Sequence, residues 1–306
     1  MKKRIDFKKI FIRAILFLVL IVICTISVLG IMQRTGIEFT QLASSTSSQS
    51  MGYVIKTKNG KVIVIDGGVE EDSDNLLRYI NEYGGKVDAW YITHPHVNNM
   101  GAFCNIISKN IDFPVKNIYV SLNDKEWYEK YTDDNTINEV KKFFDVIEND
   151  KIKNKINYVF AGQIMEYDNL SIEVLGEKNE DITSNSVNNS SMVLKLQVND
   201  KSILILGDAG AEAGIKLLKN VQYEKIKSDY VQVAHYGHNG VELQFYDIVN
   251  PRYCLWSMSI DLSNNDSSND KKSENLNIKE TYEYICNLGV QKHYFAKNGN
   301  KTLKIW

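Results

Sequence analysis

The chain has 306 residues, of which 43% are hydrophobic and 24% charged, ordinary values for a globular protein. It carries 36 basic and 38 acidic residues. Six basic residues and one acid lie within residues 2–13, so the remainder holds 30 basic against 37 acidic residues, a net charge of −7. This balance argues against non-specific nucleic-acid binding through a broadly basic surface, although it leaves a local basic groove open.

The N-terminus has the pattern of a membrane anchor. Residues 1–13 form a basic tail, and residues 14–32 are uncharged and rich in Leu, Ile and Val. A helix needs about 20 apolar residues to cross a bilayer core, and basic flanks stay in the cytoplasm. The alternative is a cleaved signal peptide, but its apolar core would be only about 7–15 residues long, and no small-x-small cleavage site follows. We therefore expect a single-pass cell-membrane protein with an extracytoplasmic C-terminal domain.

Residues 33–50 are polar and include a Ser-rich run from Ser44 to Ser50, which predicts a flexible linker. Residues 51–306 suit one α/β domain with a full core. Three cysteines follow the anchor, namely Cys104, Cys254 and Cys286. Their number is odd and they lack C-x-x-C spacing, so we interpret them as small buried apolar residues.

The first half of the domain predicts strands that alternate with helices. The expected strands are 53–57, 61–65, 87–92 and 116–121, and the expected helices are 74–83, 100–107 and 135–148. Asn59-Gly60 is a strong tight-turn signal between the first two strands, and the apolar positions of each helix fall on one face.

The second half predicts hairpins from 163–167 with 170–175 and from 191–198 with 201–206. A short helix over 210–219, strands over 230–234 and 252–256, and a polar loop over 262–275 follow. A last helix over about 278–288 precedes strands 290–296 and 301–306, which an Asn-Gly turn joins. Strands with interspersed helices fit two sheets covered by outer helices.

Four candidate metal ligands each follow a predicted strand, namely His94, His96, Asp208 and His235. Imidazole nitrogens and a carboxylate suit zinc or a similar divalent ion. The His-x-His spacing lets one loop direct two imidazoles at one point, and Pro95 stiffens that loop. Each residue alone is a weak signal, but the four in this order form a strong one.

These motifs resemble the metallo-β-lactamase superfamily, with the closest likeness to the hydrolase-like domain of bacterial DNA-uptake channel proteins and their stand-alone relatives. The resemblance runs from about Met51 to Trp306 and rests on segments 64–68, 92–96, 188–191, 206–208 and 233–237. It implies an αββα sandwich with a metal site at one edge of the sheets. It also implies that His94 and His96 bind a first metal, that Asp208 is the bridging carboxylate, and that His235 binds a second metal.

The metal motif departs from the family pattern Thr-His-x-His-x-Asp-His. Asn98 and Asn99 stand where the family has the Asp and the His of the second metal. An asparagine carbonyl is neutral and its amide nitrogen accepts no hydrogen bond, so both are poor substitutes. We therefore expect at most one divalent ion, zinc or another, or no ion at all.

Three further residues have open roles. Asp66 matches a residue that would orient a ligand histidine. His238 is either a replacement ligand or a surface residue of a Gly-rich loop. Tyr236, where relatives have a second His, would either donate a hydrogen bond to a substrate oxyanion beside Asp208 or only pack.

The sequence leaves three functions open. The first is a one-metal hydrolase for phosphoesters or another small substrate, a phosphodiesterase or nuclease-like enzyme at the cell surface. The second is a pseudoenzyme that binds without turnover, and the third is a structural domain beside an unidentified membrane partner. Asn98 and Asn99 favour the second, whereas the four retained ligands favour the first.

Overall fold

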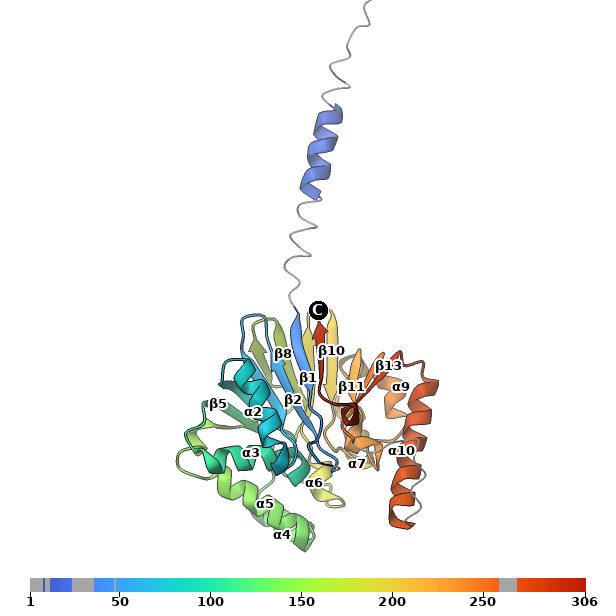
Figure 1. The fold of residues 1–306 in the computed structure, drawn as a ribbon. Coiled ribbons are helices and arrows are strands. Elements are labelled where there is room, and N and C mark those ends of the chain that lie inside the picture. The colour runs from blue at the N-terminus through green and yellow to red at the C-terminus, as the bar shows by residue number, and fades with distance from the viewer. Residues whose placement is uncertain (1–7, 9–11, 24–35, 47, 259–268) are drawn as a thin grey trace, which may run out of the picture.

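The computed structural model describes residues 8, 12–23, 36–46, 48–258 and 269–306, with the backbone alone for 269–276. Two seven-stranded sheets pack face to face, and helices cover their outer faces (Figure 1). The order in the first sheet is β14-β1-β2-β3-β4-β5-β6, and in the second it is β13-β12-β11-β10-β9-β8-β7. This is the layered α/β architecture that the sequence predicts.

The strands of the first sheet are β1 (Ile37–Gln41), β2 (Gly52–Lys56), β3 (Val62–Asp66), β4 (Val87–Ile92), β5 (Val115–Val120), β6 (Ile156–Tyr158) and β14 (Lys301–Ile305). Those of the second are β7 (Ile164–Tyr167), β8 (Leu170–Gly176), β9 (Val193–Val198), β10 (Lys201–Ile205), β11 (Tyr230–Gln232), β12 (Tyr253–Trp256) and β13 (Lys292–Phe295). Strands β3 to β6 are parallel, as are β10 to β13, so each set ends at one edge of its sheet.

The longer helices are α2 (Ser73–Glu82), α3 (Val97–Lys109), α4 (Lys125–Tyr131), α5 (Asp134–Ile147), α7 (Ala211–Asn220) and α10 (Asn269–Asn287). Short helical turns are η1 (Glu70–Asp72), η2 (Lys153–Lys155), α6 (Ser186–Asn189), α8 (Tyr223–Ile226), η3 (Ala234–Gly237), α9 (Phe245–Val249) and η4 (Ala296–Asn298). Helices α2, α3 and α5 lie beside the first sheet, and α7, α9 and α10 lie beside the second (Figure 1).

Two buried clusters hold these layers together, and the alternation of side chains along each strand separates them. Ile63 and Ile65 on β3 point into the cluster between the sheets, whereas Val62 and Val64 point toward the helices. Trp90 and Phe103 pack edge to face in the helix-side cluster, with ring centroids 5.0 Å apart. Period-two alternation with both faces buried is what a strand between two layers requires.

The segment 33–50 is not a flexible linker throughout, which corrects the sequence-based expectation. Residues 37–41 form β1, which pairs antiparallel with both β2 and β14, and Phe39 is fully buried. The Ser-rich run that follows is held by the buried carboxylate of Asp72, which accepts from the Ser45 backbone and the Ser50 hydroxyl. Serine composition suggested flexibility, but one buried acceptor fixes this run.

Three other expectations require correction near the C-terminus. Strands β13 and β14 are not a hairpin, because β13 pairs with β12 in the second sheet and β14 pairs with β1 in the first. The predicted loop 262–275 is helical from Asn269, where α10 begins, and residues 259–268 lie outside the described part. Cys104 and Cys254 are buried as expected, but Cys286 is exposed.

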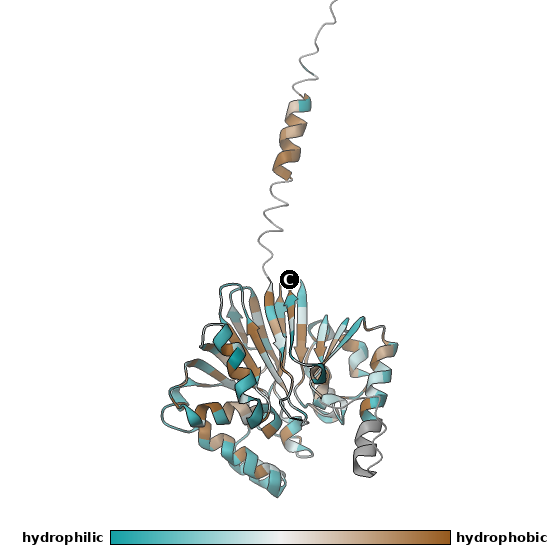
Figure 2. Ribbon diagram, in the orientation of Figure 1, coloured by the Kyte–Doolittle hydropathy of each residue, from teal (hydrophilic) through white to brown (hydrophobic). Residues whose placement is uncertain are grey.

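The predicted transmembrane segment 14–32 is described only in part. Residues 12–23 are helical and mostly hydrophobic (Figure 2), and residues 24–32 lie outside the described part. Among the helices that the structure describes, none is long and apolar enough to span a membrane.

We predict that a chain beginning at Met51 is markedly less stable than one beginning at Gly36. The shorter chain lacks Ile37 and Phe39, which are 2% and 0% exposed, and burial of each such side chain contributes about 1.5–3 kcal/mol. The thermal midpoint should fall by about 10 °C, at roughly 2–4 °C per kcal/mol for a domain of this size. Calorimetry of the two chains measures this, and equal midpoints would show that β1 contributes nothing.

Candidate metal centre

The candidate ligands meet at the edge where parallel strands of both sheets end. His94 and His96 follow β4, Asp208 follows β10, and His235 follows β11. One nitrogen of each of His94 and His96 and one oxygen of Asp208 lie within 4.8 Å of one another. His235 borders this group, with its Nε2 4.0 Å from Asp208 Oδ2.

Several polar atoms of this group are buried without a hydrogen-bond partner. They are His94 Nε2, both carboxylate oxygens of Asp208, and His235 Nδ1. His94 Nε2 lies 3.4 Å from Asp208 Oδ2, and the two atoms form no hydrogen bond. Buried polar atoms without partners are costly, so this cluster fits a divalent ion that would satisfy them.

The electrostatics of the group also suit a metal. Burial, aided by His94, lowers the pKa of His96 to about 3, so its imidazole is neutral and retains a lone pair for an ion. Burial would raise the pKa of Asp208, but the neighbouring imidazoles of His94 and His235 hold it below its ordinary value. The site therefore presents a neutral imidazole on His96 and an ionised carboxylate on Asp208.

Asp66 organises the first histidine through Thr93. The Asp66 carboxylate accepts hydrogen bonds from the Thr93 backbone N–H and hydroxyl, both at 2.7 Å. Because the Thr93 proton goes to Asp66, its oxygen is left to accept from His94 Nδ1 at 3.0 Å. This assignment leaves the Nε2 lone pair of His94 facing Asp208. Asp66 thus fixes the ring of His94 through Thr93, and the role of His94 as a metal ligand stays a prediction.

Asn99 belongs to the same hydrogen-bond network, and both polar atoms of its side chain are bonded to protein groups. Its Nδ2 donates to Asp66 Oδ2 at 2.9 Å, and its Oδ1 accepts from the Tyr236 hydroxyl at 3.2 Å. Asn99 and Tyr236 are both fully buried. Burial and the charges of Asp208 and Asp66 raise the pKa of Tyr236 well above its ordinary value, so it remains a donor.

The structure therefore changes the interpretation of Tyr236. Its hydroxyl donates to Asn99 and its side chain has no exposure, so it is not placed to meet a substrate oxyanion.

Asn98 lies at the start of α3, half-buried, and its backbone carbonyl accepts from the Met51 N–H at 3.0 Å. His238 is half-buried, and its Nε2 lies 3.0 Å from Asn239 Nδ2.

Backbone conformation shapes the loop that carries His235. His235, Tyr236 and Gly237 have positive φ values of 47°, 59° and 87° in succession. Such a run is uncommon and costs about 1–3 kcal/mol for each non-glycine residue. A Cβ at Gly237 would lie 2.6 Å from the Trp256 ring, so only glycine fits there. These three positive φ values reverse the direction of the chain and place His235 beside Asp208.

Three further residues of the sequence motifs, Thr93, Asn188 and Ser191, contribute to the site although the sequence analysis gave them no role. Thr93 transmits the orientation of Asp66 to His94, as described above. Ser191 accepts a hydrogen bond from the Asp208 backbone N–H at 3.1 Å, and Asn188 beside His96 counteracts the lowering of the pKa of that histidine. Thr93 directly precedes His94, whereas Ser191 lies 17 residues from Asp208, so the signal for Asn188 and Ser191 was the motif 188–191 itself.

Solved structures of low identity share this architecture. The metallo-beta-lactamase fold protein YhfI from Bacillus subtilis matches with a TM-score of 0.52 and 10% identity, over 89% of this chain and 100% of its own. Yeast PDE1, in its unliganded structure, matches with a TM-score of 0.51 and 12% identity, over 89% and 100%. CmlA, a diiron beta-hydroxylase from Streptomyces venezuelae, matches with a TM-score of 0.56 and 9% identity over 89% of this chain.

The chain spans about half of CmlA, 54% of its length. No protein-family profile matches the sequence, and no curated protein matches it. The likeness lies in the arrangement of two sheets with outer helices, at identities that establish architecture alone. On this evidence the chain has the metallo-β-lactamase fold.

Proposed function

We propose that this protein is a metal-dependent hydrolase with a site for one divalent ion. The observation that carries the proposal is the convergence of His94, His96 and Asp208, whose inward atoms lie within 4.8 Å of one another. The unpartnered atoms of His94, Asp208 and His235 support the same conclusion. These residues would hold the ion.

A bound divalent ion supplies Lewis-acid polarisation and lowers the pKa of water toward neutrality. The chain's own residues prepare the site for that chemistry. Thr93 and Asp66 fix the ring of His94, and Ser191 fixes the backbone of Asp208. Asp208 is the acidic member of the ligand group and the residue we assign to catalysis, because Asp66 already accepts three hydrogen bonds from protein donors.

Turnover is expected to be slow because two features of two-metal hydrolases are replaced. Asn98 offers no basic group to remove a proton from water. Asn99 is bound on both sides, by Asp66 and by Tyr236, so it adds no ligand for a second ion. Loss of electrostatic stabilisation of this type typically costs several kcal/mol of barrier.

A phosphodiester is the substrate class that we propose. The support is the fold shared with a phosphodiesterase, yeast PDE1, at 12% identity.

A second candidate function is a binding module without turnover. The observation that favours it is the Asp66–Asn99–Tyr236 bridge, which stabilises the fold without a metal at that position.

We predict slow hydrolysis of bis(p-nitrophenyl) phosphate by the full chain in detergent with excess zinc or manganese. His94→Ala should abolish this rate, because it removes a ligand with an unpartnered Nε2. The double change Asn98→Asp, Asn99→His should raise the rate at least about tenfold by restoring a base and a ligand. Asn138→Asp, on the exposed face of α5, is the matched control and should change nothing.

Three outcomes decide between the two functions. Activity that His94→Ala abolishes establishes the hydrolase. No activity in the native chain, with activity in the double variant, establishes a pseudoenzyme. No activity in either form, or native activity that persists in His94→Ala, contradicts the proposed hydrolase.

We further propose that residues 1–32 anchor the protein in the cell membrane with the domain outside. The support is the basic tail followed by an uncharged apolar run. Cys286 is exposed, whereas Cys104 and Cys254 are buried, so Cys286 reports the location of the domain. A membrane-impermeant maleimide should label the native chain in intact cells, and it should not label Cys286→Ser. Labelling that requires cell lysis would place the domain inside.

A further inference from the structure

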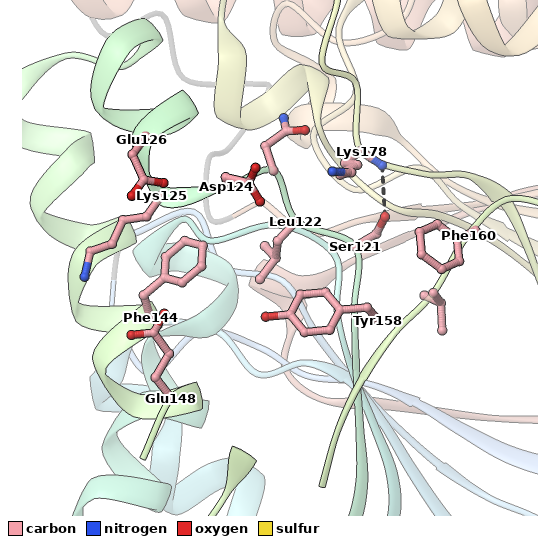
Figure 3. A pocket seen from close by; sticks show the side chains of 12 residues that line it. Ser121, Leu122, Asp124, Lys125, Glu126, Phe144, Glu148, Tyr158, Phe160 and Lys178 are labelled. Carbon is pink, nitrogen blue, oxygen red and sulfur yellow. Dashed lines mark hydrogen bonds between the residues drawn. The ribbon is translucent and has the colours of Figure 1, made fainter. Parts of the chain in front are cut away.

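A pocket of about 420 Å³ lies beside the metal centre, outside the candidate ligand group. Its walls come from the carboxyl ends of β5 and β6, the start of α4 and the face of α5 (Figure 3). Strands β4, β5 and β6 are parallel, so the pocket opens at the edge of the sheet that also carries His94. The volume falls within the roughly 300–1,000 Å³ of small-molecule sites.

Two hydrogen bonds link the pocket to the metal centre. Asn123, in the pocket wall, donates through Nδ2 to Ser190 Oγ at 3.1 Å. The next residue, Ser191, accepts from the Asp208 backbone at 3.1 Å. Because consecutive Cα atoms are about 3.8 Å apart, the pocket wall and Asp208 are separated by on the order of 10 Å. A small molecule that contacts both must span that separation.

Asn123 presents an acceptor that no protein group satisfies. The side chain is 2% exposed, and its Oδ1 is buried without a hydrogen-bond partner. Its Nδ2 also lies 3.4 Å from the Asn179 carbonyl, which agrees with the assigned orientation of the amide. An unsatisfied buried acceptor destabilises the fold, so a ligand N–H group that pairs with Asn123 Oδ1 would recover that free energy.

Exposed aromatic rings form a second feature of the pocket. Tyr158 and Phe160 are each 52% exposed, and Tyr158 lies across the pocket between Phe160 and Phe144 (Figure 3). Exposed rings beside a buried amide form a surface for a planar heterocycle. A base stacks favourably on an aromatic side chain of this kind.

The charges of the pocket argue for a base and against a phosphate. Carboxylates of Asp124, Glu126 and Glu148 line it as further acceptors. Its two lysines are already engaged: Lys125 lies 3.8 Å from Asp145, and Lys178 lies 2.6 Å from Glu180. An acceptor-rich wall selects a ring that carries N–H donors, and it repels an anion.

We propose that this pocket binds the purine base of a nucleotide-type phosphodiester, while the phosphate lies at the metal centre. The base would stack on Phe160 or Tyr158 and donate an N–H to Asn123 Oδ1. The placement of the phosphate at the metal centre rests on the proposed hydrolase function, whereas binding of the base does not. The assignment to a purine follows from the size of the pocket and its many acceptors.

The test measures binding of guanosine and adenosine, which lack phosphate, to the full chain by calorimetry. At least one of the two should bind, and Phe160→Leu or Tyr158→Leu should weaken that binding about tenfold, which corresponds to ~1.4 kcal/mol. Tyr223→Leu is the matched control, because Tyr223 is 50% exposed and lies on α8, outside the pocket lining. Ribose 5-phosphate, which lacks a base, should not compete.

The outcomes separate this proposal from the hydrolase. Nucleoside binding that survives His94→Ala but is weakened by Phe160→Leu supports the pocket even if no phosphodiester is hydrolysed. Hydrolysis of bis(p-nitrophenyl) phosphate without nucleoside binding overturns the pocket and leaves the hydrolase intact. Binding that the Phe160 and Tyr158 variants leave unchanged also overturns it.

Discussion

The buried carboxylate of Asp66 is the interaction on which the metal centre depends. It sits at the end of β3 with a positive φ of 54°, and burial raises its pKa to about 6 despite stabilisation by His94, Asn99 and Thr93. A buried carboxylate is tolerated only when its oxygens are hydrogen-bonded, and Asp66 accepts three such bonds. Two of them fix Thr93, which orients His94, and the third fixes Asn99. The position of the Asp66 carboxylate thus determines the orientation of both His94 and Asn99.

The same network explains how the fold tolerates an incomplete metal motif. In place of a ligand imidazole, Asn99 donates to one neighbour and accepts from another, so none of its side-chain atoms is left unsatisfied. Tyr236 supplies the donor, at the position where the family resemblance implies a histidine. The two substitutions are therefore coupled: an asparagine alone would leave its carbonyl buried without a partner, at a cost of about 1–3 kcal/mol. The result is a neutral bridge beside the candidate metal site.

Much of the fold was predictable because its strands bury both faces and end at clear turns. The expected strand 87–92 is β4 as observed, and His94, His96 and Asp208 meet as the motifs imply. Three features needed tertiary information. Strand β1 lies in a polar segment and becomes a strand only because β2 and β14 flank it. The Ser-rich run is fixed by Asp72, which is 22 residues from Ser50. The Tyr236–Asn99 bond joins residues 137 positions apart, a pairing that spacing along the chain does not reveal.

The number of divalent ions per chain tests the central claim most directly. The full chain, dialysed against zinc and analysed by elemental mass spectrometry, should hold one ion, and His94→Ala should hold none. The triple change Asn98→Asp, Asn99→His, Tyr236→His removes the neutral bridge and restores the family's ligands, so it should hold two. One ion in the native chain and two in the triple variant is the result that the account predicts. Two ions in the native chain would contradict it, because Asn99 would then not close the second position; no ion would show that the unpartnered atoms of His94 and Asp208 do not form a metal site.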